Sequence, residues 1–118
     1  MVAERRGDTL PSHELRRGLS LSRERMARLV DMSAKTVERW EQQQSLPPRT
    51  SSRIRIQLAQ IQEVRDLGLC LYTPEGFRLF LRTPLPVFAG RTPLRMIEQG
   101  KTDDVISALA SDYEGLGY

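Results

Sequence analysis

Small and cationic side chains gather over residues 33–39. Ser33 has the character of a helix cap, so the residues after it open a predicted helix over 34–43. At the exposed start of such a helix, Ala34 can touch a thymine methyl group, and Lys35 and Arg39 can reach the acceptor atoms of guanine. The candidate base-contacting residues are Ser33, Ala34, Lys35, Thr36 and Arg39.

The charges of the chain are unevenly distributed. Residues 1–55 carry 12 basic and 7 acidic side chains, whereas residues 56–118 carry 6 basic and 8 acidic ones. Arginine supplies 16 of the 18 cations, and its forked guanidinium suits phosphate and guanine; a GC-rich or thermophilic source would produce the same bias. Glu38 could accept from a cytosine, but we expect it to face solvent. The candidate phosphate-contacting residues are Arg23, Arg28 and Arg49.

The sequence offers little to a catalytic or metal site. His13 is the only histidine, and no nucleophile pairs with it by pattern. Cys70 is expected to be buried as a small apolar side chain. Asp103 and Asp104 open a predicted helix, where negative charge suits the helix dipole. We therefore predict no enzyme, no catalytic residue, no metal site and no cofactor.

Caps, breakers and apolar repeats predict an all-α fold. A short first helix ends at Gly18, and Ser22 caps a second helix over 23–30. The third helix over 34–43 is followed by a fourth over 51–67, which Gly68 is expected to stop. Apolar residues recur in the fourth helix at spacings of three and four, as in an amphipathic helix: Ile54, Leu58, Ile61 and Val64.

The second and third predicted helices meet across a very short gap, which is the pattern of a helix-turn-helix that binds DNA. Ala27 is small, as two closely crossing helices require. Asp31 occupies the tight turn and is among the few residues that tolerate left-handed backbone geometry. The remaining inward-facing residues of the unit are predicted to be Met26, Val30, Met32, Val37 and Trp40.

Residues 21–49, LSRERMARLVDMSAKTVERWEQQQSLPPR, resemble without a gap the helix-turn-helix of the lambda-repressor/Cro and Xre type. Arg23 stands where glutamine is commoner in that type, and Asp31 replaces the glycine of the turn. The resemblance implies that the exposed start of the helix over 34–43 enters the major groove of DNA. The alternative is a helical pair used only for protein contact.

Thr-Pro pairs punctuate the second half, at 73–74, 83–84 and 92–93. Threonine as a cap followed by proline is a strong helix start. We predict helices over 74–81, 93–99 and 103–113, with PLPVFAG as a turn-rich connector and a module boundary near 67–72.

Residues 73–118 resemble the toxin-binding domain of the MbcA/ParS/Xre antitoxin family. The shared pattern is an apolar pair (Phe80 and Leu81), a Thr-Pro, the turn AGRTPL at 89–94, a stop at Gly100, and a buried stripe in the last helix (Val105, Ile106 and Leu109). Tryptophan is often the first member of the pair in that family, and phenylalanine replaces it here.

The tail that follows is glycine-rich, acidic and aromatic, so it could enter a pocket on a basic partner; a frayed chain end is the simpler reading. The resemblance favours toxin binding. The candidate toxin-binding residues are Tyr113, Glu114, Gly115, Leu116, Gly117 and Tyr118.

Together these patterns predict a helix-turn-helix domain at 1–67 and a toxin-binding domain at 68–118. The resemblance implies a homodimeric antitoxin of a type II toxin–antitoxin pair. Such a protein represses its own operator and blocks the active site of a RES-domain toxin that consumes NAD. The rival is a stand-alone Xre-type repressor whose second module dimerises or senses a ligand. A purely structural interaction protein is a third class.

No apolar run approaches the roughly 20 residues that span a bilayer and no secretory signal is evident, so a cytoplasmic location without membrane contact is expected.

Overall fold

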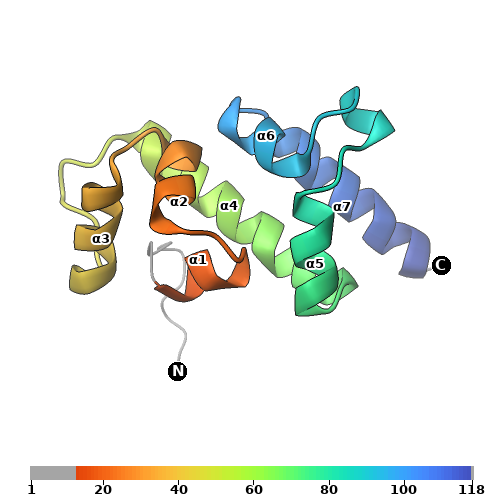
Figure 1. Cartoon of the computed structure of the whole chain (residues 1–118), viewed down its shortest axis with the longest axis horizontal. Coiled ribbons are helices and arrows are strands. Elements are labelled where there is room, and N and C mark those ends of the chain that lie inside the picture. Colours follow the sequence, from red (N-terminus) through yellow and green to blue (C-terminus); the bar gives the residue numbers. More distant parts are fainter. Residues whose placement is uncertain (1–12, 118) are drawn as a thin grey trace.

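The computed structural model describes the backbone of residues 13–117 and the side chains of residues 13–114. This part of the chain is entirely helical, without strands, as predicted. None of its helices is both long and apolar enough to cross a membrane. The elements, labelled in Figure 1, are α1 (His13–Gly18), α2 (Arg23–Val30), α3 (Ala34–Gln43), α4 (Ser52–Leu71), α5 (Pro74–Leu81), the 3-10 turn η2 (Pro86–Phe88), α6 (Pro93–Glu98) and α7 (Thr102–Gly117).

Helix α4 runs through the middle of the molecule, between α2 and α3 on one side and α5 and α7 on the other (Figure 1). Its most extensive contacts are with α7, and α1, α2 and α5 also pack on it. The predicted apolar repeat is confirmed, because Ile54, Leu58, Ile61 and Val64 are all buried. One amphipathic helix therefore supplies core to both halves of the chain.

The corner between α2 and α3 has the predicted geometry. Ser22 and Ser33 cap the two helices, each accepting a bond from a backbone N–H of the first turn. Asp31 adopts the left-handed conformation, with φ 59° and ψ 44°. Met32 is partly buried against the core, and Trp40 is only 3% exposed. The rest of the predicted inner face is buried: Met26, Ala27, Val30 and Val37.

The predicted stop at Gly68 is wrong, because α4 continues to Leu71. Gly68 is a packing residue rather than a helix breaker. A Cβ added there would lie 2.1 Å from Cε1 of Phe77, whose ring is fully buried. The absence of a side chain thus lets α5 approach α4 closely. The predicted module limit between residues 67 and 68 falls inside this continuous helix.

The predicted burial of Cys70 is also wrong, since its side chain is exposed. Cys70 follows the buried Gly68 by two positions, which is about 200° around a helix of 3.6 residues per turn. Once α4 continues past Gly68, Cys70 must therefore point away from the core.

In the second half, the Thr-Pro pairs at 73–74 and 92–93 begin α5 and α6 as predicted, whereas the pair at 83–84 begins no helix. Thr73 accepts a bond from the N–H of Gly76, and Thr92 accepts one from Arg95, each at 3.1 Å. The last helix is longer than predicted, because α7 extends to Gly117 instead of ending at Tyr113. Val105 and Leu109 of its predicted stripe are buried, and Ile106 is partly buried.

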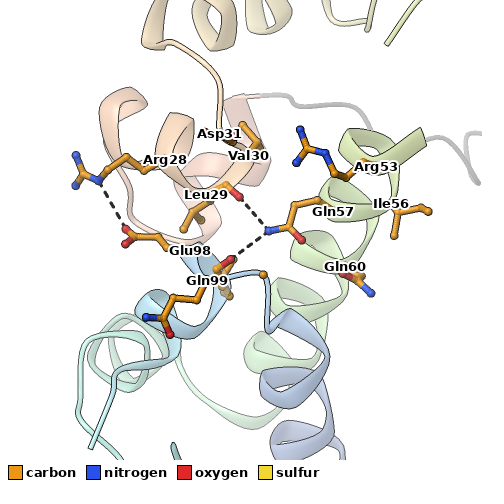
Figure 2. A pocket seen from close by; sticks show the side chains of 12 residues that line it. Arg28, Leu29, Val30, Asp31, Arg53, Ile56, Gln57, Gln60, Glu98 and Gln99 are labelled. Atoms are coloured by element: carbon orange, nitrogen blue, oxygen red, sulfur yellow. Dashed lines mark hydrogen bonds and ion pairs between the residues drawn. The ribbon is translucent and has the colours of Figure 1, made fainter. Parts of the chain in front are cut away.

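A polar junction ties the two halves together (Figure 2). The side-chain amide of Gln57, on α4, donates to the carbonyls of Leu29 at 2.9 Å and Ile97 at 3.3 Å. Its oxygen accepts a bond from the buried hydroxyl of Thr102 at 3.1 Å. Gln57 thereby satisfies backbone and side-chain groups of α2, α6 and α7 where these helices meet.

Charged side chains reinforce this junction at two points. Glu98 of α6 is an ion-pair partner of Arg25 at 2.7 Å and of Arg28 at 3.7 Å, both on α2. Arg82, after α5, donates to the carbonyl of Ser20 at 2.6 Å, in the turn between α1 and α2. The orientation of α2 is thus fixed by residues from the second half of the chain.

The contact between Gly68 and Phe77 gives a stability prediction. In an exposed helix interior Gly→Ala stabilises by about 1 kcal/mol. Gly68→Ala should instead lower the free energy of unfolding by about 1–3 kcal/mol, because the added methyl group overpacks the ring. Urea unfolding of Gly68→Ala, Phe77→Leu and the double variant measures this in a double-mutant cycle. Leucine should relieve part of the cost, with a coupling energy above about 0.5 kcal/mol. A stabilised Gly68→Ala variant would contradict the packing described here.

Candidate functional site

The start of α3 is held by its own cap. The Ser33 hydroxyl accepts a bond from the N–H of Thr36 at 3.1 Å, and the two hydroxyl oxygens lie 2.9 Å apart. Both hydroxyls are therefore occupied within the helix start. The first turn of α3 contains no acidic residue, so the positive end of the helix dipole is not neutralised by its own side chains.

Glu41 is the carboxylate that fixes α3 against α1 and α2. Arg16 binds it through two nitrogens, with Nε 2.7 Å from Oε2 and Nη2 3.3 Å from Oε1. Nε of Arg23 donates to Oε1 at 3.1 Å. Burial alone would raise the pKa of Glu41, but the hydrogen bonds and charges of Arg16 and Arg23 hold it below its ordinary value. The glutamate therefore stays charged and keeps the helices in register.

The starts of α2 and α3 border a hollow of about 420 Å³. Three of the predicted DNA-binding residues, Arg23, Ala34 and Lys35, meet there. The complete lining is Arg16, Ser22, Arg23, Glu24, Ala34, Lys35 and Glu38. The hollow thus combines a methyl group, cationic donors and carboxylate acceptors, which are the groups that can match base edges and phosphates.

Three charged side chains of α3 have no internal partner. Lys35, Glu38 and Arg39 make no hydrogen bond or ion pair with any residue in the described range 13–114. Lys35 and Arg39 are exposed, whereas Glu38, which we expected to face solvent, is partly buried. This face of α3 therefore presents charges that are available to an external partner.

Two of the predicted phosphate-contacting residues lie elsewhere. Arg28 borders a different hollow, of about 850 Å³, where it faces Glu98 on α6 (Figure 2). Arg49 is exposed in the connection between α3 and α4. The structure brings neither of them to the hollow at the starts of α2 and α3. Arg23, which does lie there, shares its guanidinium with Glu41.

The predicted toxin-binding residues form the end of α7. Tyr113 is 53% exposed and Glu114 is also exposed. The backbone of Gly115, Leu116 and Gly117 continues the helix, so the expectation of a tail loosened by glycine is wrong up to Gly117. Tyr118 lies outside the described residues.

Beside α7, residues of the η2 segment and α7 border a groove of about 700 Å³, where Val87 is 71% exposed.

Sequence reasoning missed the residues that position this site. Gln57, Glu98 and Arg82 orient α2, yet each is a polar residue on a helix or at its end, where the pattern is equally typical of a solvated surface. Glu41 had a usable signal, since an acidic residue directly after the buried Trp40 lies beside the core. The sequence contained no comparable signal for Arg16 as its main partner.

The chain was compared with known proteins. No protein-family model matches it, and no curated protein matches it. Among solved structures it is similar to a chain of the crystal structure of the M. tuberculosis MbcT-MbcA toxin–antitoxin complex, with a TM-score of 0.71. The two chains share one fold. The similarity covers 86% of this chain and 89% of that chain, at 22% sequence identity. At this coverage the similarity includes residues from both halves of the chain.

The buried Glu41 gives a pH prediction. Because its pKa is lowered on folding, Glu41 contributes stability that is fully present above its ordinary pKa of 4.5 and is lost as the pH falls through the folded-state value. Glu41→Gln should lower the free energy of unfolding by about 1–3 kcal/mol at pH 7. This difference should shrink as the pH falls below about 4.5.

Urea unfolding at a series of pH values measures the effect of Glu41→Gln. Glu63→Gln, an exposed change on α4, is the matched control and should alter stability by less than about 0.5 kcal/mol. A cost for Glu41→Gln that is the same at pH 7 and pH 3 would show that the ionised carboxylate is not what holds the three helices.

Proposed function

We propose that this chain is the antitoxin of a type II toxin–antitoxin pair, with no catalytic activity of its own. Residues 1–67 bind operator DNA as an autorepressor, and residues 68–118 hold a RES-domain toxin that consumes NAD. The observation that carries the proposal is the fold similarity to a chain of a toxin–antitoxin complex over 86% of this chain. The resemblance of residues 73–118 to the MbcA/ParS/Xre family supports the same role.

The face of α3 supports the DNA-binding part of the proposal. Lys35 and Arg39 are exposed cations without an internal partner in the described range 13–114, and Ala34 lies beside them. In helix-turn-helix proteins the start of the second helix of the unit reads base edges, and the first helix crosses the phosphate backbone. We propose that Arg23, Arg28 and Arg49 supply phosphate contacts. Arg28 also lies 3.7 Å from Glu98, measured from Nε to Oε2.

The end of α7 supports the toxin-binding part. Its exposed acidic residues are Asp112 and Glu114. A pocket that binds NAD must receive a negative pyrophosphate and flat rings, so it should carry cationic groups and surfaces that accept a ring. An acidic helix end with Tyr113 exposed matches such a pocket. We propose that residues 113–118 block it, with the backbone of residues 113–117 entering as the end of a helix and not as an extended thread.

The rival function is a stand-alone repressor whose second half only dimerises or senses a ligand. Co-expression with the neighbouring open reading frame separates the two. Recovery of a stable complex with a RES-like protein supports the antitoxin, and recovery of this chain alone supports the repressor.

Operator binding gives the first prediction of this proposal. We expect a homodimer on a pseudo-palindromic operator, with half-sites about 34 Å apart or a multiple of that spacing. Lys35→Ala and Arg39→Ala should each weaken specific binding by about 1–3 kcal/mol, because each removes a contact to a base edge. Gel-shift titrations at fixed salt measure the loss. Lys101→Ala, an exposed lysine between α6 and α7, is the control and should bind nearly as the wild type does. Unchanged operator affinity in the Lys35/Arg39 double variant would rule out α3 as the recognition helix.

Toxin inhibition gives the second prediction. Residues 115–118 lie beyond Leu109, which is the last buried residue of α7 within the described range. A protein that lacks them should therefore fold and still bind the operator. The truncated protein should restore most of the NAD turnover of the toxin, because it lacks the last four residues of the proposed blocking segment while the docking helices remain. NAD consumption at saturating antitoxin measures this. Full inhibition by the truncated protein would place neutralisation in another part of the surface.

A further inference from the structure

Two glutamates one helical turn apart on α3 have opposite surroundings. Glu41 is buried and neutralised by Arg16 and Arg23. Glu38 is partly buried, and within the described range 13–114 it has no hydrogen bond or ion pair. The fold thus pairs the charge of Glu41 and leaves the charge of Glu38 without an internal partner among the described residues.

The position of Glu38 relates this charge to the candidate interface. Glu38 lines the hollow at the starts of α2 and α3, together with Ala34 and Lys35. Residues 35 and 38 are three apart, so their side chains project from the same face of the helix. A carboxylate therefore lies in the surface that the proposed function presents to DNA.

A carboxylate in this place opposes binding to most sequences. Phosphates repel it, and the major-groove edges of guanine and thymine offer it only acceptor atoms. Adenine presents an amino group that a carboxylate could accept from, but its neighbouring acceptor N7 repels the carboxylate. Cytosine presents its 4-amino donor without a neighbouring acceptor on the same base, and glutamate accepts from it.

We infer that Glu38 is a specificity-determining residue, which accepts a hydrogen bond from the 4-amino group of a cytosine in the operator. The inference rests on the proposed operator binding and deepens it. Lys35, on the same face, suits the O6 and N7 acceptors of the guanine in the same base pair. The two side chains together then select a C·G pair in one orientation and lower the affinity for other DNA.

Glu38→Gln tests this role. Glutamine keeps the size of the side chain, removes the charge and prefers the N6 and N7 atoms of adenine. Because Glu38 has no described partner, its replacement should leave the melting temperature within about 3 °C of the wild type. Glu63→Gln is the matched control, since Glu63 is exposed on α4 and does not line the hollow.

The experiment is a selection of sites from randomised duplex DNA, performed with the full-length wild type and both variants. The wild type and Glu63→Gln should favour cytosine by about tenfold at one position of the site. Glu38→Gln should reduce that preference to about twofold or less, raise the share of adenine there, and bind random DNA about two- to fivefold more tightly at low salt.

The possible results separate the inference from the proposed function. If the wild type selects a site and Glu38→Gln selects the same site with the same strength, the inference is overturned and operator binding stands. If the wild type selects no site and binds DNA without salt dependence, operator binding fails and the inference fails with it. If Glu38→Gln has a lower melting temperature than the wild type and an unchanged base preference, Glu38 has a structural role instead.

Discussion

The burial of one face of α4, from Ile54 to Gly68, is the constraint on which this structure depends. Its apolar residues from Ile54 to Val64 pack against helices from both halves of the chain, and Gly68 admits the ring of Phe77 close to its backbone. Among the described residues 13–117, α4 is the longest helix, with 20 residues against 16 for α7. The helix-turn-helix and the C-terminal helices are therefore two surfaces of one packed body.

Polar groups add direction to this packing. Gln57 joins the backbones of α2 and α6 to the start of α7, and Glu98 and Arg82 link the second half to α2 and to the turn before it. Hydrophobic burial is not directional, so it would permit small rotations of α2 against α6. The hydrogen bonds of Gln57 penalise such rotations, because each would leave a buried polar group without a partner.

Local signals in the sequence were sufficient to predict the helices and the corner between α2 and α3. Serine and threonine caps, Asp31 in its left-handed turn and the buried Trp40 act over a few residues, and each was predicted correctly. The errors at Gly68 and Cys70 arose where a distant residue decided the outcome. Gly68 is a typical helix stop until Phe77 is known to pack on it, and Cys70 was misjudged with it. The division of the candidate DNA-binding arginines between two hollows likewise depended on Glu98, which no local pattern marks.

The continuity of α4 has a consequence for the history of the chain. In proteins built from independent domains, the domains are joined by linkers, and recombination within a linker leaves the core of each domain intact. Here an exchange near residue 68 would cut α4 within its last turn and separate Gly68 from the residues around it. Viable recombinants would have to inherit α4 together with the residues that pack on both of its ends. The two halves should therefore have diverged as a single inherited unit, with change concentrated on exposed positions of α3 and α7.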